Sequence, residues 1–129
     1  MVAGDRARVL AAATSEKTPE LRAEAVRQLG VMSAHDELWQ LYQKESTVEV
    51  KKQIIQAMFV GGNSTRLIEL ANSEPNAELR RTAIRNLGVM NSKQTADALV
   101  ALYAKEKDVE LRKAVIQGLF VQNSAEQLV

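Results

Sequence analysis

Apolar side chains recur along this chain in a pattern that has the spacing of an amphipathic helix. They occupy a starting position and the positions four, five and eight residues later, and so share one helical face. The pattern occurs four times, in the columns Leu21, Val50, Leu79 and Leu111; Ala25, Ile54, Ala83 and Val115; Val26, Ile55, Ile84 and Ile116; and Leu29, Met58, Leu87 and Leu119. It predicts four equivalent helices, which we call the A helices.

Each predicted A helix has a recognisable start. The segments "TPELR", "TVEVK", "NAELR" and "DVELR" recur every 29 to 32 residues, and they begin at Thr18, Thr47, Asn76 and Asp108. Each opens with a side chain that can accept a backbone N–H bond at a helix N-cap. A Glu follows two places later, where the helix dipole favours negative charge.

A second amphipathic pattern lies between the A helices and predicts a B helix in each gap. Its columns are Val9, Leu38, Leu67 and Leu99; Ala12, Leu41, Leu70 and Leu102; and Leu10, Trp39, Ile68 and Val100. One antiparallel helix pair cannot bury its apolar face alone, whereas stacked pairs form a continuous core. The sequence therefore predicts an all-α fold, an α–α superhelix (α-solenoid) of stacked antiparallel helix pairs.

The register predicts a single array over residues 1–129. It has three full repeats, 18–46, 47–75 and 76–107, between a partial repeat 1–17 with a B helix and a partial repeat 108–129 with an A helix. We expect the chain to be a segment of a longer array. A chain that opens with a B helix and closes with an A helix could also stack head to tail on further copies, because each junction would complete a repeat.

Neighbouring repeats alternate in type. "LRAEAVRQLGVM" begins at Leu21 and returns as "LRRTAIRNLGVM" at Leu79, 58 residues later. One column holds Gly30 and Gly88 in these two repeats but Phe59 and Phe120 in the other two. The duplicated unit is therefore a pair of repeats.

The recurring N-cap, "LR", Ala and "LG" resemble the short HEAT-like repeats that are also found in phycobilin lyases. The resemblance covers nearly all of the chain. It implies an interaction scaffold for a protein or peptide, in which the row of B helices lines a concave binding surface. We call the predicted partner-binding residues the B row; they are Glu37, Gln40, Gln43, Arg66, Glu69 and Asn72.

Charge leaves a second interpretation open. The A helices carry a basic strip of Arg22, Lys51, Arg80 and Arg112, which could bind nucleic-acid phosphates. Against this, 17 basic and 16 acidic side chains nearly cancel, and no aromatic residues interleave with the strip. Ion pairs with the nearby Glu20, Glu49, Glu78 and Glu110 would also account for it. A purely architectural spacer is the third interpretation.

Catalytic chemistry is not predicted. The chain has no cysteine and one histidine, His35, so no catalytic, cofactor-binding or metal-binding residue is assigned and an enzyme is not expected. The aromatic side chains of Trp39, Tyr42, Phe59 and Phe120 are expected in the core. Neither a signal peptide nor a membrane span is predicted, and the sequence assigns no compartment.

Overall fold

The computed structural model describes residues 2–90 and 92–128, with side chains over 6–90 and 92–121. Every regular element in this part of the chain is an α-helix, and no strand occurs among these residues, which confirms the predicted all-α fold. The chain divides into two compact units, Met1–Asn63 and Ser64–Val129, which we call unit 1 and unit 2. The grouping of all helices into one array over 1–129 stays a prediction.

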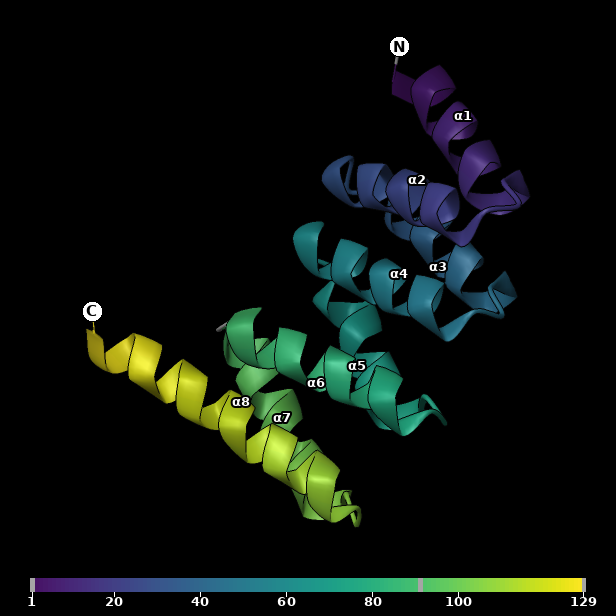
Figure 1. The fold of residues 1–129 in the computed structure, drawn as a ribbon. Helices are drawn as coiled ribbons and strands as arrows, with labels where there is room; N and C mark the ends of the chain where they lie inside the picture. Colours follow the sequence, from purple (N-terminus) through teal and green to yellow (C-terminus); the bar gives the residue numbers. More distant parts are fainter. Residues whose placement is uncertain (1, 91, 129) are drawn as a thin grey trace. The chain divides into compact units, whose positions relative to one another are not determined.

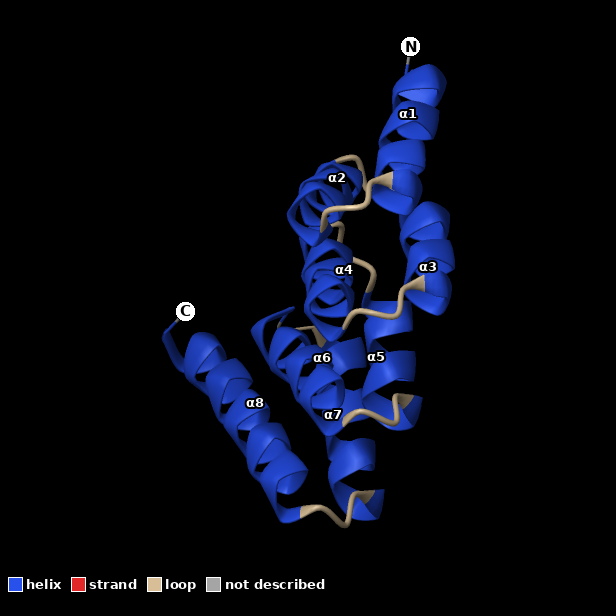
Figure 2. Cartoon of the chain, turned by 45° about the vertical axis from the view of Figure 1, so that its right-hand side comes forward, coloured by secondary structure: helices blue, strands red, loops and turns tan. Residues whose placement is uncertain are grey.

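Unit 1 contains two B helices and two A helices in alternation. They are α1 (Val2–Ser15), α2 (Pro19–Val31), α3 (His35–Lys44) and α4 (Val48–Val60) (Figure 1). The A helices α2 and α4 pack on each other, α1 packs on α2, and α3 contacts both A helices. Figure 2 shows the result as two layers, with α2 and α4 in one and α1 and α3 in the other.

Unit 2 repeats this order. Its helices are α5 (Ser64–Ser73), α6 (Ala77–Met90), α7 (Lys93–Lys105) and α8 (Val109–Leu128). The A helices α6 and α8 pack on each other, α5 packs on α6, and α7 lies against both. The segment that recurs after 58 residues in the sequence thus corresponds to two units with the same order of helices.

The predicted apolar columns form the core with a few exceptions. Leu29, Met58 and Leu87 of the A helices are buried, as are Leu38, Leu67 and Leu99 of the B helices. The buried Tyr42 confirms one aromatic prediction, and Trp39 and Phe59 are half-buried.

Four residues of the predicted apolar columns and aromatic core are exposed instead: Val100 of the B helix α7, which is 59% exposed, and three residues of A helices. Leu21 lies on the first A helix, and Ile116 and Phe120 lie on the last, and each exposes half or more of its side chain. The prediction for Phe120 was wrong, since it is 67% exposed. None of the described helices covers these three side chains. The apolar columns therefore extend onto α2 and α8 at positions that lack the neighbouring helix that buries equivalent residues elsewhere.

Two of the four predicted side-chain caps are present. The Oδ1 atoms of Asn76 and Asp108 accept the N–H groups of Leu79 and Leu111, each at 3.1 Å. Thr18 and Thr47 have the extended backbone of N-cap residues, but neither side chain makes a capping hydrogen bond, so the prediction was wrong there. The Thr47 hydroxyl oxygen instead accepts a hydrogen bond from the Arg22 guanidinium at 3.4 Å.

Glycine allows the A helices of each unit to approach closely. A Cβ atom added to Gly30 would lie 2.8 Å from the Cα of Ala57, and one added to Gly88 would lie 2.6 Å from the Cα of Gly118. Both distances are shorter than van der Waals contact with a backbone atom that has no room to move. This explains why the alternating column holds glycine on α2 and α6.

We expect Gly88→Ala to lower the free energy of unfolding by about 1–3 kcal/mol, because the added methyl group meets backbone. Gly118→Ala is the matched control, since its Cβ would lie 3.3 Å from the Leu99 side chain and 3.4 Å from the Gly88 Cα. Both changes gain about 1 kcal/mol of helix propensity. Urea unfolding followed by circular dichroism should show the larger loss for Gly88→Ala; equal effects would contradict the close crossing.

The turns that follow the A helices α2 and α4 of unit 1 use one left-handed residue each. Ser33 has φ 55° and Gly62 has φ 77° at equivalent positions of the two turns. Ser33→Gly should raise the free energy of unfolding by about 0.5–1 kcal/mol, because the left-handed backbone is strained for a residue with a Cβ. Gly62→Ser should lower it, although no atom lies within 4 Å of the added Cβ. Urea unfolding measures both, and the same sign for the two variants would refute this account.

Candidate protein interface

Three residues of the B row follow one side of α3 in unit 1. Glu37, Gln40 and Gln43 are three residues apart, so they form one stripe along the helix. Gln40 and Gln43 are exposed and Glu37 is half-exposed, while the opposite side of α3 is buried through Leu38 and Leu41. The amide groups of this stripe are therefore accessible to a partner.

The other three residues of the B row lie on α5 in unit 2. Arg66 Nη1 donates to Glu69 Oε1 at 2.8 Å, and Asn72 Nδ2 donates to the carbonyl oxygen of Ile68 at 2.8 Å. Glu69 and Asn72 are exposed, and Arg66 is partly exposed. This stripe is thus held by its own hydrogen bonds while its outer surface remains accessible.

The neighbouring B helix differs between the two units. Beside α3 in unit 1, α1 exposes Arg8 and Ala11. Beside α5 in unit 2, α7 exposes Ala101 and Ala104, whose short side chains leave the surface flat. A polar hollow of about 320 Å³ also opens next to Asn72 and is lined by Arg80, Leu102, Lys105, Glu106 and Lys107.

The basic strip is engaged in contacts within each unit. In unit 1, the Arg22 guanidinium donates to both carboxylate oxygens of Glu45, each at 3.3 Å. The two side chains are only 16% and 11% exposed. In unit 2, Arg80 makes the equivalent ion pair with Glu106. These arginines join one A helix to the loop that precedes the next A helix.

The other two strip residues lie over tyrosine rings. Lys51 Nζ is 5.2 Å from the ring centroid of Tyr42, and Arg112 Cζ is 4.3 Å from that of Tyr103. Both geometries are those of a cation–π contact. The strip therefore alternates between carboxylate and aromatic contacts, with the same two-repeat period as the sequence.

The acidic partners of the strip were not predicted. Carboxylates on the A helices were expected to pair with it, whereas the ion pairs are made by Glu45 and Glu106 in the loops before α4 and α8. The sequence held a signal for them, because a Glu stands two residues before each of the four predicted N-cap residues, as Glu16, Glu45, Glu74 and Glu106.

These loop carboxylates also bind backbone. An oxygen of Glu45 accepts the N–H of Thr47 at 3.0 Å, and Glu74 and Glu106 accept the N–H groups two residues after them at 2.8 and 2.9 Å. Burial on its own would raise the pKa of Glu45. The hydrogen bonds from the Thr47 backbone and the Arg22 guanidinium outweigh burial, and the pKa lies below its ordinary value.

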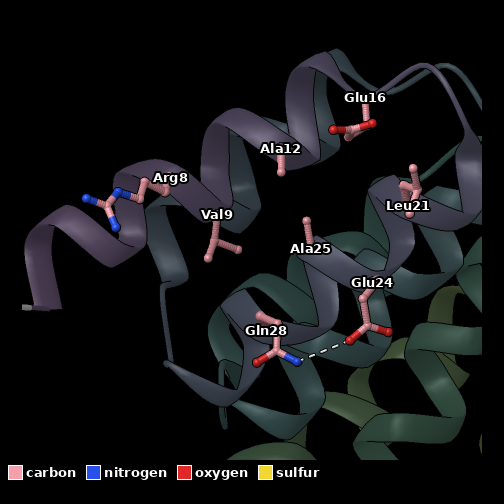
Figure 3. Close-up of a pocket in the computed structure, with 8 residues that line it drawn as sticks. All are labelled: Arg8, Val9, Ala12, Glu16, Leu21, Glu24, Ala25 and Gln28. Atoms are coloured by element: carbon pink, nitrogen blue, oxygen red, sulfur yellow. Dashed lines mark hydrogen bonds between the residues drawn. The ribbon is translucent and has the colours of Figure 1, made fainter.

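A hollow of about 310 Å³ opens between α1 and α2 in unit 1 (Figure 3). Val9 and Ala12 of α1 and Leu21 and Ala25 of α2 form its apolar part. Polar side chains complete its lining: Arg8, Glu16, Glu24 and Gln28. Sequence reasoning did not predict this hollow, because these columns were assigned to the core.

Other chemistry is sparse in the part of the chain that the structure describes. His35 is exposed at the start of α3, and no group of three or more metal-ligating side chains occurs among these residues. None of the described helices combines the length and apolar character needed to cross a membrane.

Comparison with known proteins gives one match. Residues 64–126 fit the family model of HEAT repeats, and this segment spans the four helices of unit 2. No curated protein and no solved structure matches the chain significantly.

The ion pair of Glu45 predicts a pH-dependent stability. Because the pKa of Glu45 is lowered in the fold, the unfolded chain binds more protons once the pH drops below the ordinary value of 4.5. The stabilisation is therefore complete above that value and is lost as the pH falls through the lower pKa of the folded state.

Glu45→Gln should lower the free energy of unfolding at pH 7 by about 1–2 kcal/mol and flatten its decline in acid. Urea unfolding over a series of pH values measures both effects. Glu49→Gln, at an exposed position on α4, is the control. An unchanged acid slope in Glu45→Gln would show that this carboxylate does not contribute.

Proposed function

Because this chain is a HEAT-like repeat protein, we propose that it is a scaffold that binds a protein or peptide along the exposed stripes of its B helices. HEAT repeats generally serve as protein-interaction scaffolds, and stacked repeats of this kind offer extended binding surfaces. The specific surface is the B row, with its α3 stripe in unit 1 and its α5 stripe in unit 2.

The observation that carries this proposal is a division between the two helix layers. The strip arginines of the A helices are held in internal contacts, as Arg22 is with Glu45 and Arg80 is with Glu106. In contrast, Gln40, Gln43 and Glu69 of the B helices are exposed. A partner can therefore bind the B helices without breaking the contacts that hold the repeats together.

The chemistry of the B row fits a polypeptide partner. The amides of Gln40, Gln43 and Asn72 can donate and accept hydrogen bonds, as a peptide backbone requires. Exposed charges of both signs accompany them, so selection by net charge is weak, and the short side chains of Ala101 and Ala104 permit close approach.

Binding of nucleic acid through the basic strip is less well supported. Arg22 and Arg80 would have to leave buried carboxylates before they could reach a phosphate, and a broken pair leaves an uncompensated charge behind. An architectural spacer is consistent with the fold, but it gives no role to the exposed amides of α3.

A second copy of the chain is a further candidate partner. Leu21 of unit 1 and Ile116 and Phe120 of unit 2 expose apolar surface on A helices whose equivalent residues are mostly buried. Exposed apolar faces of this kind are typical of association surfaces. This supports head-to-tail association independently of the B row.

The B row can be tested with one altered and one matched control bait. The altered bait carries Gln40→Ala, Gln43→Ala and Glu69→Ala, and the control carries Gln56→Ala and Gln117→Ala at exposed positions of A helices. Proteins captured from the source organism's lysate are identified, purified and titrated by calorimetry. We expect the altered bait to bind at least about tenfold more weakly and the control to bind like the unaltered chain.

Equal binding by all three baits would contradict the assignment to the B row. Capture of nucleic acid that is released by salt would favour the basic strip. Capture of nothing would favour the spacer.

A further inference from the structure

We infer that copies of this chain join head to tail through an ion pair between Arg112 of one copy and Glu16 of the next, beside an apolar contact. The inference rests on the proposed self-association and names its contacts. It is drawn from two apolar columns, each with one exposed member, and from the three arginines of the basic strip, of which Arg112 alone has no carboxylate partner among the described residues.

The two apolar columns lie on the A helices. In the first, Leu21 is 52% exposed, whereas Val50, Leu79 and Leu111 are at most 2% exposed. In the second, Ile116 is 51% exposed, whereas Val26, Ile55 and Ile84 are at most 1% exposed. One exposed face therefore belongs to the first A helix and the other to the last, and together they supply the two halves of a repeat junction.

The register of the existing junctions places these halves against each other. At the α2–α4 crossing the column of Gly30 meets the column of Ala57, and at the α6–α8 crossing the same two columns meet through Gly88 and Gly118. If α8 packs on α2 of another copy with the same columns opposed, Phe120 faces Gln28, and the two helices lie farther apart than at the glycine crossings because both side chains are large.

The receiving surface has the shape and chemistry that this requires. Gln28 lines the hollow between α1 and α2, whose apolar part is made by Val9, Ala12, Leu21 and Ala25 (Figure 3). Phe120 and Ile116 are exposed apolar side chains that α8 can contribute to it. The exposed face of α8 is therefore expected to bind in this hollow.

The ion pairs of the strip arginines follow a common pattern. In both units an arginine of one A helix pairs with the Glu in the loop after the following B helix, as Arg22 does with Glu45 and Arg80 with Glu106. After α8, the next B helix in a head-to-tail stack is α1 of the second copy, and the Glu after it is Glu16. Applied to Arg112, the third arginine of the strip, the pattern of the other two arginines pairs it with Glu16.

Both groups are available for this pair. Among the described residues, Arg112 has no carboxylate partner, and its Nε is buried without a hydrogen-bond acceptor. Its guanidinium is already oriented by the Tyr103 ring. Glu16 lines the hollow and has no cationic partner among the same residues.

This interface joins two different faces, so it does not close on itself as a two-fold dimer does. Each added copy presents a new free face, and the assembly grows with concentration unless the rotation closes a ring. Each added copy is therefore expected to bind through the same pair of faces as the copy before it.

Charge reversal provides the test, with sedimentation velocity over a concentration series of the 129-residue chain. Arg112→Glu and Glu16→Arg each place like charges at the junction and should weaken association by about tenfold or more. A mixture of the two variants should associate like the unaltered chain, because every alternating junction again has opposite charges. One chain carrying both changes should also associate.

Lys113→Glu and Glu20→Arg are the matched controls, because they change the net charge equally at exposed neighbouring positions. Recovery in the mixture also excludes misfolding of the single variants as the cause of their weaker association.

Two failures are distinguishable. If the unaltered chain is monomeric at every concentration, self-association itself is wrong and another occupant covers these faces. If it associates but the single reversals have no effect, or the mixture does not recover, self-association stands and the Arg112–Glu16 contact is overturned.

Discussion

The carboxylate two residues before the N-cap residue of an A helix is the group on which the repeat geometry depends. Glu45 binds the N–H of Thr47 and the guanidinium of Arg22 at once, so it fixes the start of its own helix and ties it to the preceding A helix. Glu106 does the same with the backbone of Asp108 and with Arg80. Apolar burial provides most of the stability, but it is not directional. These ion pairs are directional, and they fix which loop lies against which helix.

This arrangement also separates the structural side of each unit from its accessible side. The four residues of the basic strip on the A helices contact carboxylates or tyrosine rings, so little of the strip's charge is available to a ligand. The B helices take part mainly through apolar side chains such as Leu38 and Leu67, and their opposite stripes remain exposed. A scaffold gains from this division, because the exposed stripe can change in sequence without loss of the packing beneath it.

Much of the fold could be predicted from the sequence, because periodicity reports which positions prefer burial. The A helices begin one residue after each predicted cap residue, and the columns of Leu29 and Leu38 are buried as expected. Periodicity does not report whether a neighbour is present, so it failed for Leu21, Ile116 and Phe120. It also could not locate the partners of the basic strip, since Arg22 and Glu45 meet across a whole B helix. The role of the B row stays a prediction, because exposure alone does not select a partner.

The close crossings at Gly30 and Gly88 have a consequence for how such an array can change its length. Each of these glycines lies against a small residue of the next A helix, Ala57 in one unit and Gly118 in the other. Deletion of one repeat, 47–75, would bring Gly30 opposite the column position of Asn86, whose side chain is too large for a crossing this close. Deletion or insertion of two repeats keeps every glycine opposite a small residue. Arrays of this type should therefore evolve in steps of two repeats, with even differences in repeat number among their members.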